Sequence, residues 1–127
     1  MPCVPSTVRV SVASGGTEAN GVSKSPSISQ DGRFVAFTST APNLVPGDTN
    51  GLADIFVRDT CAGAVSCVPS TVRVSLASDG SQLSGFPADR PSLSGDGRFV
   101  AFDSNSSNLV PGDTNAVTDV FLARTGF

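Results

Sequence analysis

The side chains best suited to chemistry in this chain are acidic and amide groups that gather in one loop and recur in a second. Carboxylate and amide oxygens are the ligands that Ca²⁺ prefers, and it binds about six or more of them. The candidate calcium ligands are Asp48, Asn50 and Asp54 in the first loop and Asp113, Asn115 and Asp119 in the second. The match to an EF-hand is poor, because Gly51 falls fourth in the loop and no glutamate follows at the twelfth place.

These side chains also have a structural interpretation. Asp and Asn often accept hydrogen bonds from backbone N–H groups and so close turns. Asp48 and Asn50 would then shape the loop, and Asp54 would tie one loop to another. We prefer this interpretation and expect no cofactor, with Ca²⁺ as the alternative.

Catalytic chemistry is disfavoured by what the chain lacks. There is no histidine among the 127 residues, so neither a Ser-His-Asp nor a Cys-His arrangement can be built within it. Five of the eleven acidic residues neighbour a glycine in a turn, namely Asp31, Asp48, Asp79, Asp96 and Asp113. We therefore expect a protein that is not an enzyme.

Charge and hydropathy exclude two kinds of partner. The net charge is −3 and the isoelectric point is about 4.5, whereas nucleic-acid binding needs a basic surface. No apolar run reaches the ~18 residues of a membrane span. The first residues, 1–5, also lack the charged and apolar regions of an export signal.

Two of the three cysteines are close enough in sequence to pair. Cys61 and Cys67 lie six positions apart in a Gly/Ala-rich loop, and a disulfide there would contribute roughly 2–2.5 kcal/mol in the chain-entropy model. Cys3 aligns with Cys67 in an internal repeat, but Gly126 stands where its partner should be. The expected disulfide predicts an extracytoplasmic protein.

The chain is a single domain, 1–127, made of two repeats. Residues 31–37 and 43–50 recur letter for letter 65 positions later, and residues 3–11 recur 64 positions later. Repeat one covers about 3–66 and repeat two about 67–127. A period of this size indicates a modular array.

Each repeat contains four segments with strand patterns and none with a helical pattern. The segments are 7–13, 25–29, 33–38 and 54–58 in the first repeat, and 71–77, 90–94, 98–103 and 119–122 in the second. Asp31-Gly32 predicts a hairpin turn. The strictly alternating segments 7–13 and 71–77 should have one buried and one wet face. The two middle strands are apolar on both faces, so both faces should be covered.

This pattern favours an all-β architecture of small antiparallel sheets stacked around an axis. In a two-layer sandwich every strand would have one wet face. Stacked sheets instead cover the inner strands on both sides and leave the outer strand half exposed. The sequence therefore predicts β-propeller blades.

The repeat resembles a known family at this point. Residues 26–29, 31–37 and 51–59 are similar to the WD40-like (PD40) repeat of bacterial TolB-like propellers, and the similarity covers both repeats. The resemblance implies a six-bladed propeller outside the cytoplasm, and propellers of this kind serve as partner-binding platforms, as lids on peptidases or as secreted modules of unknown role. The loop 43–50 and the insertion 61–67 make this repeat longer than the family's usual one.

A carbohydrate-binding propeller remains an alternative function. Propeller lectins usually stack an aromatic ring on the sugar, with Trp or Tyr preferred, and this chain has neither. Six of its eight Phe occupy paired strand positions and should form the core, leaving Phe86 and Phe127 free. A lectin here would have to use Asn, Ser and Asp side chains.

The order of the segments predicts self-association. The chain begins with an outer strand, 7–13, and its last three segments lack one. Proteins avoid such open edges, so we expect residues 7–13 of one chain to pair with 119–122 of the next. A head-to-tail contact of this kind must either close into a ring or continue as a fibre, and we expect the ring. The expected function is thus that of a non-enzymatic assembly and binding module. With two blades per chain, a six-bladed ring would be a homotrimer, and a dimer or a tetramer is the alternative. Its ligand would be a glycan or a protein.

Overall fold

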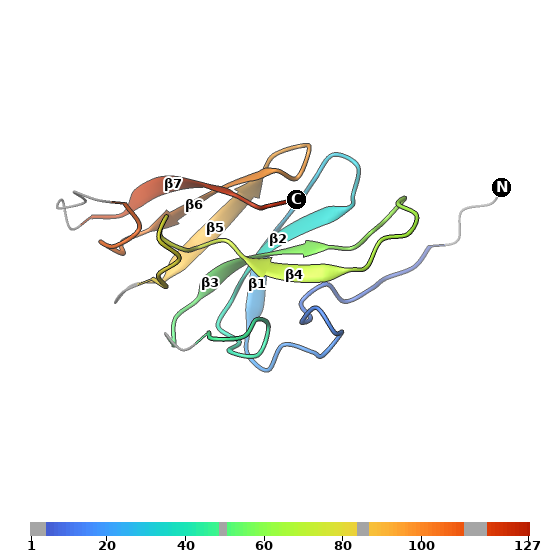
Figure 1. Cartoon of the computed structure of the whole chain (residues 1–127), viewed down its shortest axis with the longest axis horizontal. Coiled ribbons are helices and arrows are strands. Elements are labelled where there is room, and N and C mark those ends of the chain that lie inside the picture. Colours follow the sequence, from blue (N-terminus) through green and yellow to red (C-terminus); the bar gives the residue numbers. More distant parts are fainter. Residues whose placement is uncertain (1–4, 49–50, 84–86, 111–116) are drawn as a thin grey trace.

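The computed structural model shows two antiparallel sheets and describes residues 5–48, 51–83, 87–110 and 117–127 (Figure 1). The first sheet has the order β1 (Ser23–Ile28), β2 (Phe34–Ser39), β3 (Asp54–Asp59), β4 (Ser70–Arg73). The second has the order β5 (Ala88–Leu93), β6 (Phe99–Ser104), β7 (Asp119–Arg124). The predicted all-β class is confirmed. None of the described segments forms a helix of the length and apolarity that a membrane crossing needs.

The first sheet crosses the boundary between the repeats. Its last strand, β4, is the opening segment of the second repeat and pairs with β3, with Phe56 opposite Arg73 and Asp59 opposite Ser70. The pairing continues beyond β4, because the Val74 N–H donates to the Ile55 carbonyl at 2.9 Å. In the second sheet β7 pairs with β6, and no described segment pairs with its other edge.

The segment 7–13 was expected to be a strand and is not one in this chain. Its pairing is limited to an isolated bridge between Val12 and Glu18, and residues 5–9 are exposed. In Figure 1 the start of this blue segment lies away from both sheets, whereas its end contacts β4 and β3, where the Val12 and Ala13 carbonyls accept hydrogen bonds from Thr71 and Arg58. The nearly identical β4 forms because the edge of β3 lies beside it, whereas residues 7–13 have no such edge within the chain.

The hairpin between β1 and β2 has the turn that the sequence predicts. Gly32 has a φ of 77°, a conformation that residues with a Cβ rarely adopt. The Ser29 hydroxyl oxygen accepts the Phe34 N–H at 3.0 Å, and Asp31 accepts the Arg33 N–H at 3.0 Å. The second repeat has the same turn, with Gly97 at a φ of 76°.

The sheets pack face to face around one apolar cluster. Phe34, Ala36, Ile55 and Val57 from β2 and β3 meet Val100 and Phe102 from β6, together with Val74, Leu83, Ala88 and Leu109. A second cluster on the far face of the first sheet contains Phe37, Ala41, Leu44 and Phe56. Every residue of β2 and β3 is buried, so both of their faces are covered as expected, whereas in β6 and β7 the expectation is wrong because burial alternates along each strand.

Two sequence expectations about exposure are wrong. The segment 71–77 is not half wet, because Thr71 and Ser75 on its supposedly wet face are buried under neighbouring loops. Phe127 is not free, because its ring lies 5.0 Å from the ring of Phe34. Phe86, the other phenylalanine expected to be free, lies outside the described residues.

Candidate assembly interface

The outer strand of the second sheet presents apolar side chains to solvent. Val120 is 79% exposed and Leu122 is 72% exposed. Their equivalents one repeat earlier, Ile55 and Val57, are fully buried. Since Ile55 and Val57 are buried by the second sheet, Val120 and Leu122 are apolar side chains that lack the corresponding cover.

Other residues on the same face of the second sheet are also more exposed than their equivalents in the first sheet. Phe99 and Ala101 on β6 are half-buried, whereas their equivalents Phe34 and Ala36 are buried in the apolar cluster between the sheets. Val117 is 55% exposed. The outward face of the second sheet therefore carries the same kinds of side chain that hold the first sheet to the second.

A groove runs beside the free edge of β7. It has a volume of about 510 Å³ and is lined by residues 121–124 of β7 and by residues 76–78 of the segment after β4. The related hollow beside the first sheet is lined by residues 13–15 and by Thr71 of β4. Thr71 of β4 thus forms part of the wall beside the first sheet, while the groove beside β7 is lined by β7 itself, with Arg73 and Val74 reaching it from the outer strand of the first sheet.

Thr71 shows how an outer strand is held in place. Its N–H donates to the Ser14 hydroxyl oxygen at 3.0 Å, and its own hydroxyl donates to the Val12 carbonyl at 2.5 Å. Arg58 donates to the same hydroxyl at 3.1 Å. These contacts bind the outer strand both to β3 and to the segment that crosses over it.

The candidate calcium ligands Asp48 and Asp54 come together around an arginine. The Arg73 guanidinium lies 3.2 Å from Asp48 and 3.7 Å from Asp54, and all three side chains are at least nine-tenths buried. Asp54 also accepts the Ser75 hydroxyl at 2.9 Å. Because Arg73 supplies the positive charge between the two carboxylates, this arrangement fits the structural interpretation of Asp54.

The remaining calcium candidates are only partly placed. Asn50, Asp113 and Asn115 lie outside the described residues. Asp119 begins β7 and is the equivalent of Asp54. Arg9, the equivalent of Arg73, forms an exposed ion pair with Glu18.

The cysteine pair is where the sequence predicts it. Cys61 and Cys67 lie at disulfide distance, with their Cα atoms 5.7 Å apart. Together with Asp59 they are the single cluster within the described ranges whose atoms are close enough to hold a metal, and the S–S bond occupies both sulfur atoms. Such a pair indicates an oxidising environment outside the cytoplasm.

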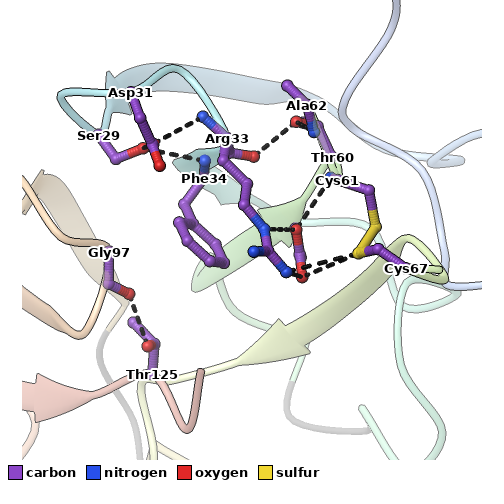
Figure 2. Close-up of polar contacts among 11 residues, drawn as sticks. Ser29, Asp31, Arg33, Phe34, Thr60, Cys61, Ala62, Cys67, Gly97 and Thr125 are labelled. Atoms are coloured by element: carbon purple, nitrogen blue, oxygen red, sulfur yellow. Dashed lines mark hydrogen bonds and ion pairs between the residues drawn. A yellow bond between two sulfur atoms is a disulfide. The ribbon is translucent and has the colours of Figure 1, made fainter. Parts of the chain in front are cut away.

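Figure 2 shows the ion pair that anchors this loop to the hairpin. Arg33 donates to both carboxylate oxygens of Asp59, at 2.8 and 2.9 Å, and the Cys61 N–H donates to the same carboxylate at 2.9 Å. The hydrogen bonds from Arg33 and then from Cys61 lower the pKa of Asp59, although burial opposes them. Asp59 is therefore ionised at neutral pH, and the guanidinium lies over the Phe34 ring at 4.9 Å.

The second sheet lacks this anchor. Arg124 stands at the position equivalent to Asp59, and Gly126 stands at that of Cys61. Arg98 is the equivalent of Arg33, and its partner position is therefore occupied by Arg124 instead of a carboxylate such as that of Asp59. The second sheet therefore lacks, at Arg124 and Gly126, the ion pair and the disulfide that hold the corresponding end of the first sheet.

Sequence reasoning missed these ion pairs for a common reason. Arg73 belongs to the second repeat, whereas Asp48 and Asp54 belong to the first, and Arg33 and Asp59 are 26 positions apart. Asp48 lies in the loop between β2 and β3, and each of the other partners is a charged residue in or next to a strand. The strand pattern alone did not indicate which charges would meet.

The chain matches no family model, no curated protein and no solved structure. The function must therefore be inferred from its own residues and from the repeat within it.

Proposed function

We propose that the protein is a non-enzymatic assembly module that associates head to tail into a closed β-propeller. Residues 7–13 of one chain would complete the second sheet of the next, as β4 completes the first sheet. The observation that carries the proposal is the outward face at Val120 and Leu122, whose internal equivalents are fully buried.

The internal repeat supplies the register of the pairing. In the first sheet Phe56 lies opposite Arg73 and Arg58 lies opposite Thr71. One repeat later, β7 offers Phe121 and Ala123 at these places, and the incoming chain offers Arg9 and Thr7. Backbone hydrogen bonds along a free strand edge provide affinity, and side-chain pockets provide specificity.

The side-chain contacts of the outer strand can be transferred in the same way. The Thr7 hydroxyl of the incoming chain would donate to the Leu76 carbonyl, and the Ser78 hydroxyl would accept the Thr7 N–H. Arg9 would leave its exposed partner Glu18 and enter beside Asp119, as Arg73 lies beside Asp54. The groove of about 510 Å³ beside β7 lies where this strand would enter.

A contact between different surfaces of two identical chains must either close into a ring or continue as a fibre. Propellers close at about four to eight blades. With two sheets per chain, the closed forms are a dimer, a trimer and a tetramer. The six-bladed form of the TolB-like family, which the repeat resembles, makes the trimer our choice.

The proposed ring accounts for two further features of the chain. A strand edge left open invites uncontrolled pairing, and an array of two repeats is below the three or so that stacked repeats need. Closure of the ring removes both problems. Outside the cytoplasm, in a secreted or periplasmic setting, the loops of such a ring would bind a protein or a glycan.

Light scattering coupled to size exclusion tests this proposal. We expect a mass of about three times the 12.8 kDa of the chain. Deletion of residues 1–9 should give a monomer, because it removes the part of the donated segment that corresponds to β4 and leaves the contacts of Val12 and Ser14 with Thr71 in place. An intact chain that remains a folded monomer at high concentration would refute the ring. A stable dimer or tetramer would correct only the number of blades.

A further inference from the structure

We propose that the contact between chains is selected by opposite charges, with Lys24 of the incoming chain facing Asp103 and Asp89 of the chain that receives it. The inference rests on the proposed head-to-tail assembly and identifies what makes its two ends recognise each other. It follows from comparing the contact inside the chain with the contact that the repeat predicts between chains.

Inside the chain, Asp89 on β5 is the polar centre of the contact between the sheets. It accepts the Thr38 hydroxyl of β2 at 3.2 Å and lies 4.0 Å from the Lys24 ammonium of β1. The Ser25 hydroxyl donates to it at 3.5 Å. The neighbouring Leu93 N–H donates to the Ser27 hydroxyl oxygen at 3.0 Å, which fixes β5 along the first sheet.

One repeat later each of these positions carries a different residue. In the contact between chains, Lys24 of the incoming chain stands at the position that Asp89 has inside the chain, and Asp103 of the receiving chain stands at that of Thr38. Asp89 itself takes the place of Lys24, and Arg90 takes that of Ser25. The carboxylate that faces a hydroxyl and an ammonium inside the chain thus becomes an ammonium that faces two carboxylates and a guanidinium between chains.

The two substitutions compensate each other. If only the Thr38 position had changed, Asp103 would face a second aspartate and repel it. If only the Asp89 position had changed, Lys24 would face a threonine without a charge. Because like charges across a contact suppress wrong partners, the end of the second sheet should accept the Lys24 end of another chain and reject a surface of the Asp89 kind.

The side chains are charged and accessible. The side chain of Lys24 is 61% exposed, and that of Asp103 is 20% exposed and 3.2 Å from the Arg90 guanidinium. Burial works to raise the pKa of Asp89, but hydrogen bonds from the Arg90 N–H and the Thr38 hydroxyl lower it below its ordinary value. Asp89 is therefore an anion at neutral pH, and the receiving surface offers two carboxylates to one guanidinium.

Charge reversal of each side, separately and together, tests the inference. We expect Lys24→Asp and Asp103→Lys each to weaken association on the order of tenfold per contact, because each removes an attraction and adds a repulsion of similar size. The double variant restores opposite charges between positions 24 and 103, while Asp89 still faces position 24, and it should bind more tightly than either single variant. Dissociation is followed by light scattering over a dilution series, and the effect of the single changes should shrink as salt rises.

A neutral pair and a mixture serve as controls. Lys24→Gln and Asp103→Asn, made separately and together, give a second double-mutant cycle that introduces no like-charge contacts inside each chain. Mixing the two charge-reversed single variants should improve assembly over either alone, since the lysine introduced at position 103 of one chain faces the aspartate introduced at position 24 of the other. Thermal melts of each variant show whether the chain itself still folds.

The outcomes separate this inference from the proposed function. Losses that simply add in the double variant, or single variants that associate as the parent does, would overturn the charge pairing and leave the ring standing. A parent chain that is monomeric throughout would overturn both. Recovery in the double variant and in the mixture supports the pairing.

Discussion

The exposed pair Val120 and Leu122 gives the sharpest test of which surface assembles. Replacing both with alanine removes five carbon atoms from side chains that are 79% and 72% exposed in the single chain. At about 0.8 kcal/mol per buried CH₂, and scaled by those exposed fractions, the loss on association is roughly 3 kcal/mol per contact. This corresponds to an increase in Kd of about 100-fold.

The same change should hardly affect the single chain. Side chains that already lie in solvent contribute within about 0.5 kcal/mol to its free energy of unfolding. The matched control is Val57→Ala, since Val57 is the internal equivalent of Leu122 and is fully buried. That control should lower the free energy of unfolding by roughly 2 kcal/mol because it leaves a cavity.

Light scattering gives the association, and urea unfolding of the 10–127 fragment, which lacks the donated strand, gives the stability of the chain. Two results would refute the reasoning. One is a double alanine variant that associates as tightly as the parent. The other is a variant that destabilises the fragment as much as Val57→Ala does, which would place Val120 and Leu122 in the chain's own core.

Three further predictions concern the ion pairs and the disulfide within the chain. Asp59→Asn should lower the free energy of unfolding by about 2 kcal/mol at pH 7, a value discounted because the Arg33 side chain is 32% exposed. The pKa of Asp59 is lowered in the folded chain, so its ionised form stabilises the fold above the ordinary pKa of 3.8, and this stabilisation is lost as the pH falls below that value. The free energy of unfolding of the variant should therefore fall less steeply as the pH is lowered. Urea melts that show the same pH dependence for the variant and the parent would contradict this. Arg73→Met should cost roughly 3–5 kcal/mol by leaving buried carboxylates without their cation, and a melting temperature equal to that of the parent would contradict the ion-pair assignment. Thiol counting on the denatured, unreduced chain should find one free thiol, whereas three would show that Cys61 and Cys67 are not bonded.

The strands that the sequence predicted well are those whose apolar pattern is complete within their own repeat, although the second sheet supplies the cover for one face of β2 and β3. β2 and β3 are apolar on both faces, so covering both faces is the arrangement that removes these side chains from water. The turn at Asp31-Gly32 is equally local, because a positive φ at Gly32 suffices for it. These features need no knowledge of distant parts of the chain.

The features that were missed depend on what lies beside a segment. Residues 7–13 and β4 have nearly the same sequence, yet only β4 is a strand, since only β4 has a free edge beside it. Arg73 was expected in water because strand alternation says nothing of a loop folding over the strand. The contacts of Asp89 with Thr38 join the two sheets, and their meeting depends on how the sheets are stacked.

The central claim, that the first strand of one chain completes the last sheet of the next, can be tested with one new cysteine. Gly126 is the repeat equivalent of Cys61 and shares its positive φ, at 87° against 61°. Cys3, which lies outside the described residues, is the sequence equivalent of Cys67. In the proposed ring, Gly126→Cys should therefore form a disulfide with Cys3 of the neighbouring chain under air oxidation.

A non-reducing denaturing gel of this variant reads out both the contact and the closure. We predict covalent dimers and trimers that disappear on reduction, with no species above the trimer, and no such products from the parent or from a Cys3→Ser control. A variant that stays a single chain, or in which Cys3 bonds to the introduced cysteine of its own chain, would contradict head-to-tail strand donation. A ladder that continues without limit would contradict the closed ring.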